Sequence, residues 1–577
     1  MSTPTVIQFL SELGQILINK DGEKLDKYLV FEPPFPPIYN QVINELRQSY
    51  PEGLEDTLKV ACKQILPEDQ DGGSGGYWTA FLTFLVQYFV FVRDVNKDQL
   101  LETHDMLRDL LNHGTLALSD NSMGFVVVPT IISVSRTLAR LSIGLDKRPD
   151  LVAQLRRRES IIDDGEGTGK VTLVESSANA IREALKKCLA EKSGNAEGVD
   201  SNGKPIGRRT GIYILANLCL KLFYHCHRLR NSEQVFSNIY QQSPKLSYFP
   251  ASQRVTYLYY LGRYHFVNCH YYRAQSALQA AYDQCHRHAL KQRRRILLFL
   301  VASNIILGRF PTYQLLQRPE AQDFGAVFLP IIQAIKKGDL ATSRKILGKG
   351  HDISKWLLKR RLLLQIRSRC EVLIWRTLAR RLFLLTGFKG DKSNKAPSLG
   401  LENLRTVLVY LEKRALGLVH DRVCEGTQHT RRPHTNSIFI LNQASENPTN
   451  GASIGPLAYV HPDLEGEVDP GPEEYYTMME VETGVASLIQ QDLMHGYISH
   501  KYARFIITGA KGKSVVDIGF PNVWQTIEGQ ADKKVPGWVR VGDEGELEDG
   551  RSGLPKGGMG GTVINLANAR PAGAGPG

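Results

Sequence analysis

Apolar residues recur at helical spacing along the N-terminal part of the chain, and polar breaks separate the periodic stretches. Residues that return every three or four positions form one face of an amphipathic helix. The pattern predicts helices at residues 6–18, 38–46, 54–65, 78–92, 100–118 and 126–145. Two polar stretches follow, at 156–170 and 192–209, and their content of Gly, Asp, Ser and charge is typical of exposed loops around one further helix at 171–189.

From residue 209 to residue 387 the helical pattern is almost continuous. Gly262 is followed by Ala274, Leu278 and Ala281, which lie 12, 16 and 19 positions after the glycine. That spacing matches the packing pattern of a tetratricopeptide-like helical hairpin, in which small residues let two antiparallel helices approach closely. A second hairpin is predicted near residue 338, where a glycine ends one helix and an aspartate caps the next. We therefore expect stacked helical hairpins.

The C-terminal part changes character after a long irregular stretch. Residues 389–475 contain segments rich in Gly, Pro, Asn, Thr and His, which is typical of an insertion without one conformation. A helical face follows at 481–493 and ends at a glycine. Alternating residues then predict strands at 497–508 and 514–518, joined by a glycine-containing turn at 509–513. A helix followed by a β-hairpin is the end of a winged helix.

These patterns predict a mainly α protein, a helical-repeat (tetratricopeptide-like) array capped by a C-terminal winged helix. The expected divisions are an N-terminal helical region at 1–155, linkers around one helix at 156–208, the helical-repeat part at 209–388, an irregular insertion at 389–475, the winged helix at 476–524 and a disordered tail at 525–577.

Composition adds a bias toward anionic partners, because the formal net charge of the chain is +12. The eight cysteines show no C-x-x-C pair and are expected to be free thiols in a reducing compartment. The N-terminus has no pattern of a secretory signal. The most apolar run, residues 77–92, is shorter than a membrane-spanning helix, so a buried core helix is expected there.

Motifs for catalysis are incomplete. The segment GEGTGK at 165–170 has Asp164 in place of the first glycine of a phosphate loop, and Val171 in place of the Ser or Thr that holds magnesium. Two H-x-H pairs, at 225–227 and 286–288, are not followed by the Ser and Asp of a zinc isopeptidase. We therefore expect no enzyme activity, no cofactor and no metal.

A strongly basic segment covers residues 355–381, which carry nine positive charges against the single negative charge of Glu371. Within it Arg369, Arg376 and Arg380 form a ridge beside the buried stripe of the helix. Arg376, Arg380 and Arg381 are the residues predicted to contact phosphates. The same ridge could instead hold the acidic side of a neighbouring helix or subunit.

The predicted wing offers a further group of cations. Its candidate nucleic-acid contacts are Lys501, Arg504, Lys511 and Lys513. We expect them to bind phosphates without reading sequence, because the wing shows basic side chains and no aromatic cluster for base stacking. The alternative is that these lysines only protect an edge hairpin against aggregation.

The segment SQRVTYLYYLGRYHFVNCHYYRAQSALQAAYDQCHRHALKQRRRILLFLVASNIILGRFPT at 252–312 resembles the PCI-domain family. The likeness continues through WRTLARRLFLL at 375–385 and the helix before GYISH at 496–500. This family includes the mRNA-export subunit of the TREX-two complex and signalosome-subunit-twelve-like relatives. The insertion at 425–474 and the tail have no counterpart in the family's compact pattern.

The resemblance implies a nuclear scaffold, associated with nuclear pores, beside a second PCI-domain subunit and a small acidic proteasome-lid-type subunit. It also implies binding of RNA and double-stranded DNA through a basic winged-helix surface, without membrane insertion. The alternative is a protein-interaction subunit of a signalosome-like or splicing-linked PCI complex that does not bind nucleic acid directly.

Overall fold

The computed structural model describes residues 4–66, 78–96, 98–148, 150, 172–191, 199–200, 203–390, 396–415, 476–509 and 514–531. The chain divides into two compact units, Met1–Lys533 and Lys534–Gly577, and all described residues belong to the first. This unit is mostly helical and carries one small sheet, which confirms the predicted mainly α class.

The N-terminal helices pack around large buried aromatic side chains. They are α1 (Pro4–Ile18), α2 (Gly22–Tyr28), α3 (Pro37–Ser49), α4 (Glu55–Ile65), α5 (Thr79–Asp94), α6 (Leu100–Ala117), α7 (Val128–Asp146) and α9 (Leu173–Leu189). Helix α5 is the apolar run noted in the sequence, and ten of its 16 residues are buried, so it is a core helix. The seven helices predicted here are all present, whereas the seven-residue α2 was missed because it is too short to show a period.

One helical segment of the described residues is long and apolar enough to cross a membrane by length and composition. It is Gly124–Asp146, which combines the short 3-10 helix η1 (Gly124–Val127) with α7. Within its most apolar window 67% of the residues are buried. Helix α7 contacts α2, α6, α9 and α10, so its apolar surface belongs to the protein core.

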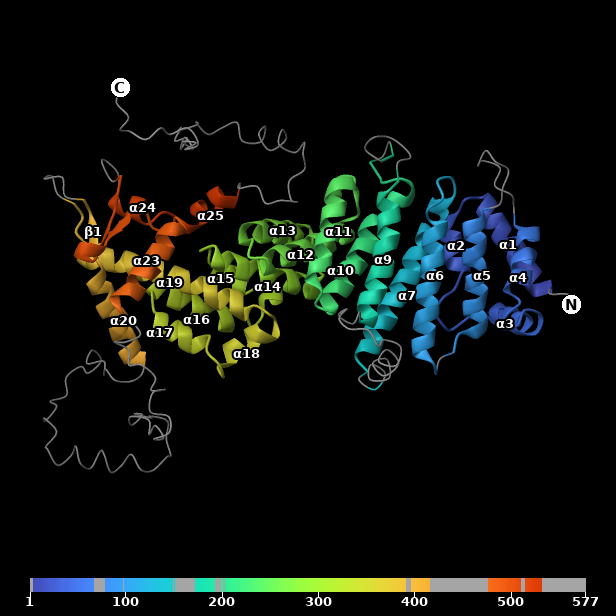
Figure 1. Cartoon of the computed structure of the whole chain (residues 1–577), viewed down its shortest axis with the longest axis horizontal. Helices are drawn as coiled ribbons and strands as arrows, with labels where there is room; N and C mark the ends of the chain where they lie inside the picture. Colours follow the sequence, from blue (N-terminus) through green and yellow to red (C-terminus); the bar gives the residue numbers. More distant parts are fainter. Residues whose placement is uncertain are drawn as a thin grey trace, which may run out of the picture. The chain divides into compact units, whose positions relative to one another are not determined.

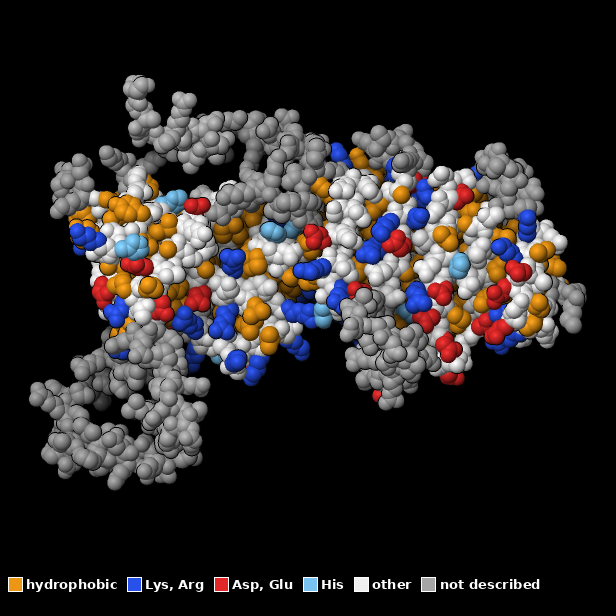
Figure 2. Space-filling model, in the orientation of Figure 1, with side chains coloured by type: hydrophobic (Ala, Val, Ile, Leu, Met, Phe, Trp, Pro, Cys, Tyr) orange, Lys and Arg blue, Asp and Glu red, His pale blue; other side chains and the backbone are white. Residues whose placement is uncertain are grey.

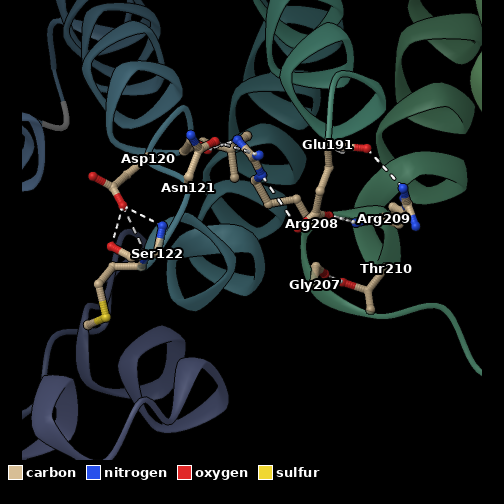
Figure 3. A network of polar contacts seen from close by, with 10 residues as sticks. Asp120, Asn121, Ser122, Glu191, Gly207, Arg208, Arg209 and Thr210 are labelled. Carbon is tan, nitrogen blue, oxygen red and sulfur yellow. Dashed lines mark hydrogen bonds and ion pairs between the residues drawn. The ribbon is translucent and has the colours of Figure 1, made fainter. Parts of the chain in front are cut away.

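A buried arginine joins the N-terminal helices to the repeats (Figure 3). Arg208 lies in η2 (Gly207–Gly211), and its Nη1 donates to the carbonyl of Leu118, 2.9 Å away, after the end of α6. Its Nε lies 3.8 Å from Oε1 of Glu191, and both side chains are 6% exposed. The second carboxylate oxygen of Glu191 accepts from the backbone N–H of Arg209 at 3.2 Å. Each buried charge therefore has a partner, as burial of charge requires.

The helical array continues as pairs of neighbouring helices (Figure 1). Its members are α10 (Ile212–His225), α11 (Leu229–Gln242), α12 (Ala251–Val267), α13 (Tyr271–Gln284), α14 (Leu290–Ile306), α15 (Tyr313–Leu316), α16 (Phe324–Lys337), α17 (Leu340–Ile346), α18 (Asp352–Lys359) and α19 (Leu363–Thr386), with short 3-10 turns η3 (Leu246–Tyr248) and η4 (Pro319–Ala321).

Both predicted hairpins are present. Gly262 of α12 faces α13 so closely that a Cβ at this position would lie 2.5 Å from Cγ of Leu278. Gly338 ends α16 in the left-handed conformation, with φ of 73°, and Asp339 caps α17 by accepting from the backbone N–H of Thr342. Local chemistry therefore sets these two corners of the array.

The C-terminal domain combines helices with a three-stranded antiparallel sheet. Its elements are β1 (Ser398–Gly400), α20 (Leu401–Ala415), α23 (Met478–Gln490), β2 (Tyr497–Ser499), the 3-10 turn η8 (His500–Tyr502), β3 (Arg504–Ile506), α24 (Val515–Gly519) and α25 (Val523–Ala531). The strand order is β1-β3-β2, so β3 is central. Leu399, Ile498 and Phe505 are paired across the sheet, and Leu399 and Phe505 are fully buried.

Three expectations for this domain need correction. Residues 396–415, placed in the irregular insertion, form β1 and α20 and complete the domain. Strand β1 was missed because three residues are too few to show alternation. The turn of the hairpin lies at 500–503, and residues 515–519 form a helix where a strand was predicted. Helix α25 extends to residue 531, past the predicted start of the tail at 525. Residues 416–475 and 532–577 lie outside the described part of the chain.

Candidate nucleic-acid interface

The β2–β3 hairpin forms the wing of the C-terminal domain. Across it Ser499 is paired with Arg504, and Tyr497 is paired with Ile506. Because side chains alternate along a strand, these four residues share the face opposite to the buried Phe505. Arg504 therefore projects from the outer face of the sheet, where it is exposed.

The wing tip is fastened to the rest of the domain. Ala503 adopts a left-handed conformation, with φ of 46°, and its carbonyl accepts from the backbone N–H of Leu401 at 2.8 Å. His500 Nδ1 lies 2.8 Å from a carboxylate oxygen of Glu482 on α23. These contacts hold the exposed Lys501 at a defined position beside Arg504.

Two exposed tyrosines accompany these cations. Tyr497 is 52% exposed and Tyr502 is 68% exposed. The Nζ atom of Lys501 lies 5.8 Å from the centroid of the Tyr502 ring. We expected no aromatic cluster for base stacking on the wing; it carries these two exposed rings, and stacking of bases on them stays a prediction. The missed signal was the tyrosine directly after Lys501 in the sequence, at the position that becomes the turn.

Lys511 and Lys513 lie outside the described residues, so their part in this surface stays a prediction. In the chain they follow the last residue of β3, Ile506, and the turn of the wing precedes that strand. The structure therefore brings together Lys501 and Arg504, and it does not describe the other two.

The second predicted group is divided by the fold. The guanidinium of Arg376 donates through Nε to the carbonyl of Leu493 at 3.3 Å, and through Nη2 to the carbonyls of Phe520, at 3.0 Å, and Pro521. Burial, together with the neighbouring Arg380, lowers the pKa of Arg376 to about 10. Arg376 thus joins α19 to the C-terminal domain, and its donors point at protein carbonyls.

The predicted phosphate contact of Arg376 is corrected on this ground. The sequence could not reveal that the C-terminal domain covers this side of α19. Arg380 is half-buried, and Arg381 is exposed but donates to the carbonyl of Lys337 at 2.7 Å. Contact of these two with phosphates stays a prediction.

Comparison with known proteins identifies relatives. No family model matches the chain. A PCI domain-containing protein of Schizosaccharomyces pombe is 25% identical over 399 residues, which cover 69% of this chain and 82% of that protein. A CSN12 homologue of Neurospora crassa is 24% identical over 351 residues, 58% of this chain and 72% of that protein. PCI domain-containing protein 2 of Danio rerio is 28% identical over 175 residues, 30% of this chain and 41% of that protein.

This chain is a relative of the PCI-domain and CSN12-like proteins. The kinship and the helical array that ends in a winged helix indicate a scaffold or interaction subunit. In this PCI-domain relative the array and the C-terminal domain share one hydrophobic core, which runs from Phe266 of α12 to Phe520 after α24.

Candidate metal ligands do not converge in the described part of this PCI-domain relative. No group of three or more His, Cys, Asp and Glu side chains is placed to hold an ion there. Seven cysteines are free thiols in the same part, and burial raises the pKa of Cys62, Cys188 and Cys370 to about 12. Such thiols stay protonated and unreactive near neutral pH. The GEGTGK segment at 165–170 and Cys424 lie outside the described residues.

Proposed function

We propose that the protein is a non-catalytic scaffold subunit of a nuclear mRNA-export complex of the TREX-two type, located at nuclear pores. In this proposal it pairs with a second PCI-domain subunit and binds RNA and double-stranded DNA through its wing. The observation that carries the nucleic-acid part is the fastened hairpin, which presents Lys501 and Arg504 together with two exposed tyrosines. Pairing with another PCI subunit is supported by the kinship with PCI-domain proteins.

Binding is proposed to be electrostatic and independent of sequence. A protein that neutralises phosphates releases counterions, so the logarithm of affinity falls linearly with the logarithm of salt concentration. The slope is about 0.7 per contact on single strands and about 0.9 on duplex. The double variant Lys501→Ala/Arg504→Ala should therefore lower the magnitude of the slope by about 1.4 on single-stranded RNA.

The experiment is fluorescence anisotropy with labelled RNA and duplex DNA at several salt concentrations, on the chain assembled with its PCI partner. A control of equal charge is Lys27→Ala/Lys59→Ala, which removes two exposed lysines from α2 and α4. Adding Lys511→Ala and Lys513→Ala to the wing variant extends the measurement to all four predicted residues. If the wing variants and the control bind alike, the wing is a solvated hairpin and the nucleic-acid part of the proposal is wrong.

A small acidic subunit is proposed to stabilise the basic array. A partner that binds only the folded chain stabilises it by about 2.7 kcal/mol at a hundredfold excess over the dissociation constant. Co-expression with an acidic proteasome-lid-type subunit should therefore raise the melting temperature and give co-purification. Absence of both would contradict this assignment.

A second candidate function is a protein-interaction subunit of a signalosome-like or splicing-linked PCI complex, without direct nucleic-acid binding. The match to CSN12 homologues favours it. Purification of the tagged protein under low salt, followed by identification of its large partner, separates the two functions. An export scaffold as partner supports the first, and signalosome subunits support the second.

A further inference from the structure

Five arginines from distant parts of the chain lie on neighbouring helices of the array. They are Arg263 of α12, Arg294 and Arg295 of α14, and Arg360 and Arg361 in the turn between α18 and α19. We call this set the arginine patch. On the face shown in Figure 2, Lys and Arg side chains gather around α14 and α18, with few acidic side chains among them.

Direct contacts link one side of the patch. The guanidinium of Arg263 lies 4.7 Å from the centroid of the Tyr224 ring, and the Tyr224 hydroxyl donates to the carbonyl of Tyr260 at 2.9 Å. Burial raises the pKa of Tyr260 to about 12, while the positive charges of Arg263 and Arg295 act in the opposite direction. Arg263 and Arg295 therefore lie around the same half-buried tyrosine.

The other side of the patch includes the α18–α19 turn. Arg294 lies 4.9 Å from the centroid of the Phe324 ring, and that ring lies 6.2 Å from the ring of Trp356, on which Arg360 stacks. Burial and then the positive charge of Arg294 lower the pKa of Arg360, while Asp323 raises it. Arg361 lies 2.7 Å from the ring of His227, at the end of α10. The pKa of His227 is lowered by burial and then by Arg361, which keeps the imidazole neutral at pH 7. Neutral His227 therefore adds no positive charge and does not offset the charge of the arginines.

Acidic side chains compensate little of this charge. Arg294 lies 3.3 Å from Asp323, which is 64% exposed. Within the described part of the chain the other four arginines have no carboxylate within 4 Å. Arg361 and His227 both adopt left-handed conformations after the ends of α18 and α10, with φ of 60° and 64°. Like charges collected in this way gain from a bound polyanion.

Aromatic rings set the orientation of the guanidinium groups. Arg360 lies 3.7 Å from the centroid of the Trp356 ring, and Arg263 lies 4.9 Å from the centroid of Phe299. A guanidinium stacked on a ring keeps its N–H groups at its edge, where they can bind phosphate oxygens. One of these groups in Arg360, Nη1, donates to the carbonyl of Trp356 at 3.2 Å. Trp356 is half-buried, so part of its side chain is open to a ligand.

We propose that the arginine patch binds single-stranded RNA as a second site, separate from the wing. Interleaved arginines and aromatic rings fit the alternation of phosphates and bases along a single strand. An acidic protein segment would match the charge alone, whereas a single strand would also use the half-buried Trp356 ring for stacking. The patch acts whether or not the wing binds nucleic acid, because it lies on the array.

The experiment measures binding of labelled fifteen-nucleotide oligouridine RNA to the full chain across a range of salt concentrations. The variant Arg295→Ala/Arg360→Ala/Arg361→Ala removes three patch cations, and Lys24→Ala/Lys27→Ala/Lys59→Ala removes three exposed lysines from α2 and α4 as the control. The patch variant should bind about tenfold or more weakly than the control, with a salt slope smaller by about 2. Circular dichroism and melting confirm that both variants fold.

A second patch variant keeps the charge. Replacement of the same three arginines by lysine retains most of the salt slope but weakens binding, because lysine lacks the planar fork. The wing variant Lys501→Ala/Arg504→Ala is measured in parallel. If the wing variant binds RNA like the control, the effect of the patch variant can still be interpreted by itself.

Two outcomes overturn the proposal. One is equal affinity and salt slope in the patch and control variants. The other is that the original chain binds polyglutamate but not oligouridine, and that the alanine patch variant no longer binds polyglutamate. That result would identify the patch as a docking surface for an acidic protein.

Discussion

Replacing Arg376 tests whether this arginine of the basic segment at 355–381 stabilises the fold or binds a ligand. The variant Arg376→Met keeps a flexible chain of similar length but removes the donors to three backbone carbonyls. A hydrogen bond from a charged group contributes about 1.5–3 kcal/mol. The contact to Leu493 is long, at 3.3 Å, and the side chain is only partly buried, so we count fewer than two full bonds. The expected loss is about 2–4 kcal/mol in the docking of the C-terminal domain.

Hydrogen exchange of backbone amides is the suitable assay, because a chain of 577 residues need not unfold in one step. Since 1.4 kcal/mol is a factor of ten in an equilibrium constant, amides of α23 and of strands β2 and β3 should exchange about 30 to 700 times faster in the variant. Amides of α5 and α6 in the N-terminal helices should be unchanged.

The matched control is Arg381→Met, since this exposed arginine of the same helix donates to a single carbonyl. Its effect should stay below about 1 kcal/mol. If Arg376→Met left exchange in the C-terminal domain unchanged and instead weakened RNA binding, the structural role argued for Arg376 would be refuted and the phosphate contact restored.

Three further predictions concern the array. Gly262→Ala should destabilise the α12–α13 hairpin by about 1–3 kcal/mol in thermal melts, because the added methyl group overlaps Leu278, whereas Gly144→Ala, which has open space, should not. Glu191→Gln should cost about 3–5 kcal/mol and expose the junction at Arg208 to limited proteolysis, because a buried cation loses its counterion; normal stability would contradict that ion pair. Burial lowers the pKa of His265 to about 3 from an ordinary 6.5, so the unfolded state binds more protons between these values. The free energy of unfolding should therefore fall by up to about 1.4 kcal/mol per pH unit as the pH drops through that window, and urea titrations of His265→Gln should show a flatter dependence.

The sequence by itself determined the helices and several of their ends. Apolar periodicity is a local property, so the long helices of the N-terminal region and the array could be predicted within a few residues. The corner at Gly338 and Asp339 was predictable for the same reason, since the glycine and the capping aspartate act on backbone groups a few residues away. The close approach at Gly262 followed from the spacing of small residues in one hairpin.

Tertiary structure alone decided the sheet and the roles of the cations. Strand β1 has three residues and pairs with β3 far along the chain, so neither its existence nor its register is encoded in a local pattern. Arg376 and Arg361 come from the same basic segment, yet one is turned toward protein carbonyls and the other lies in the exposed patch. The sequence alone shows that an arginine is positively charged. Its partner depends on which distant backbone or side chain packs against it, and only the folded chain determines that contact.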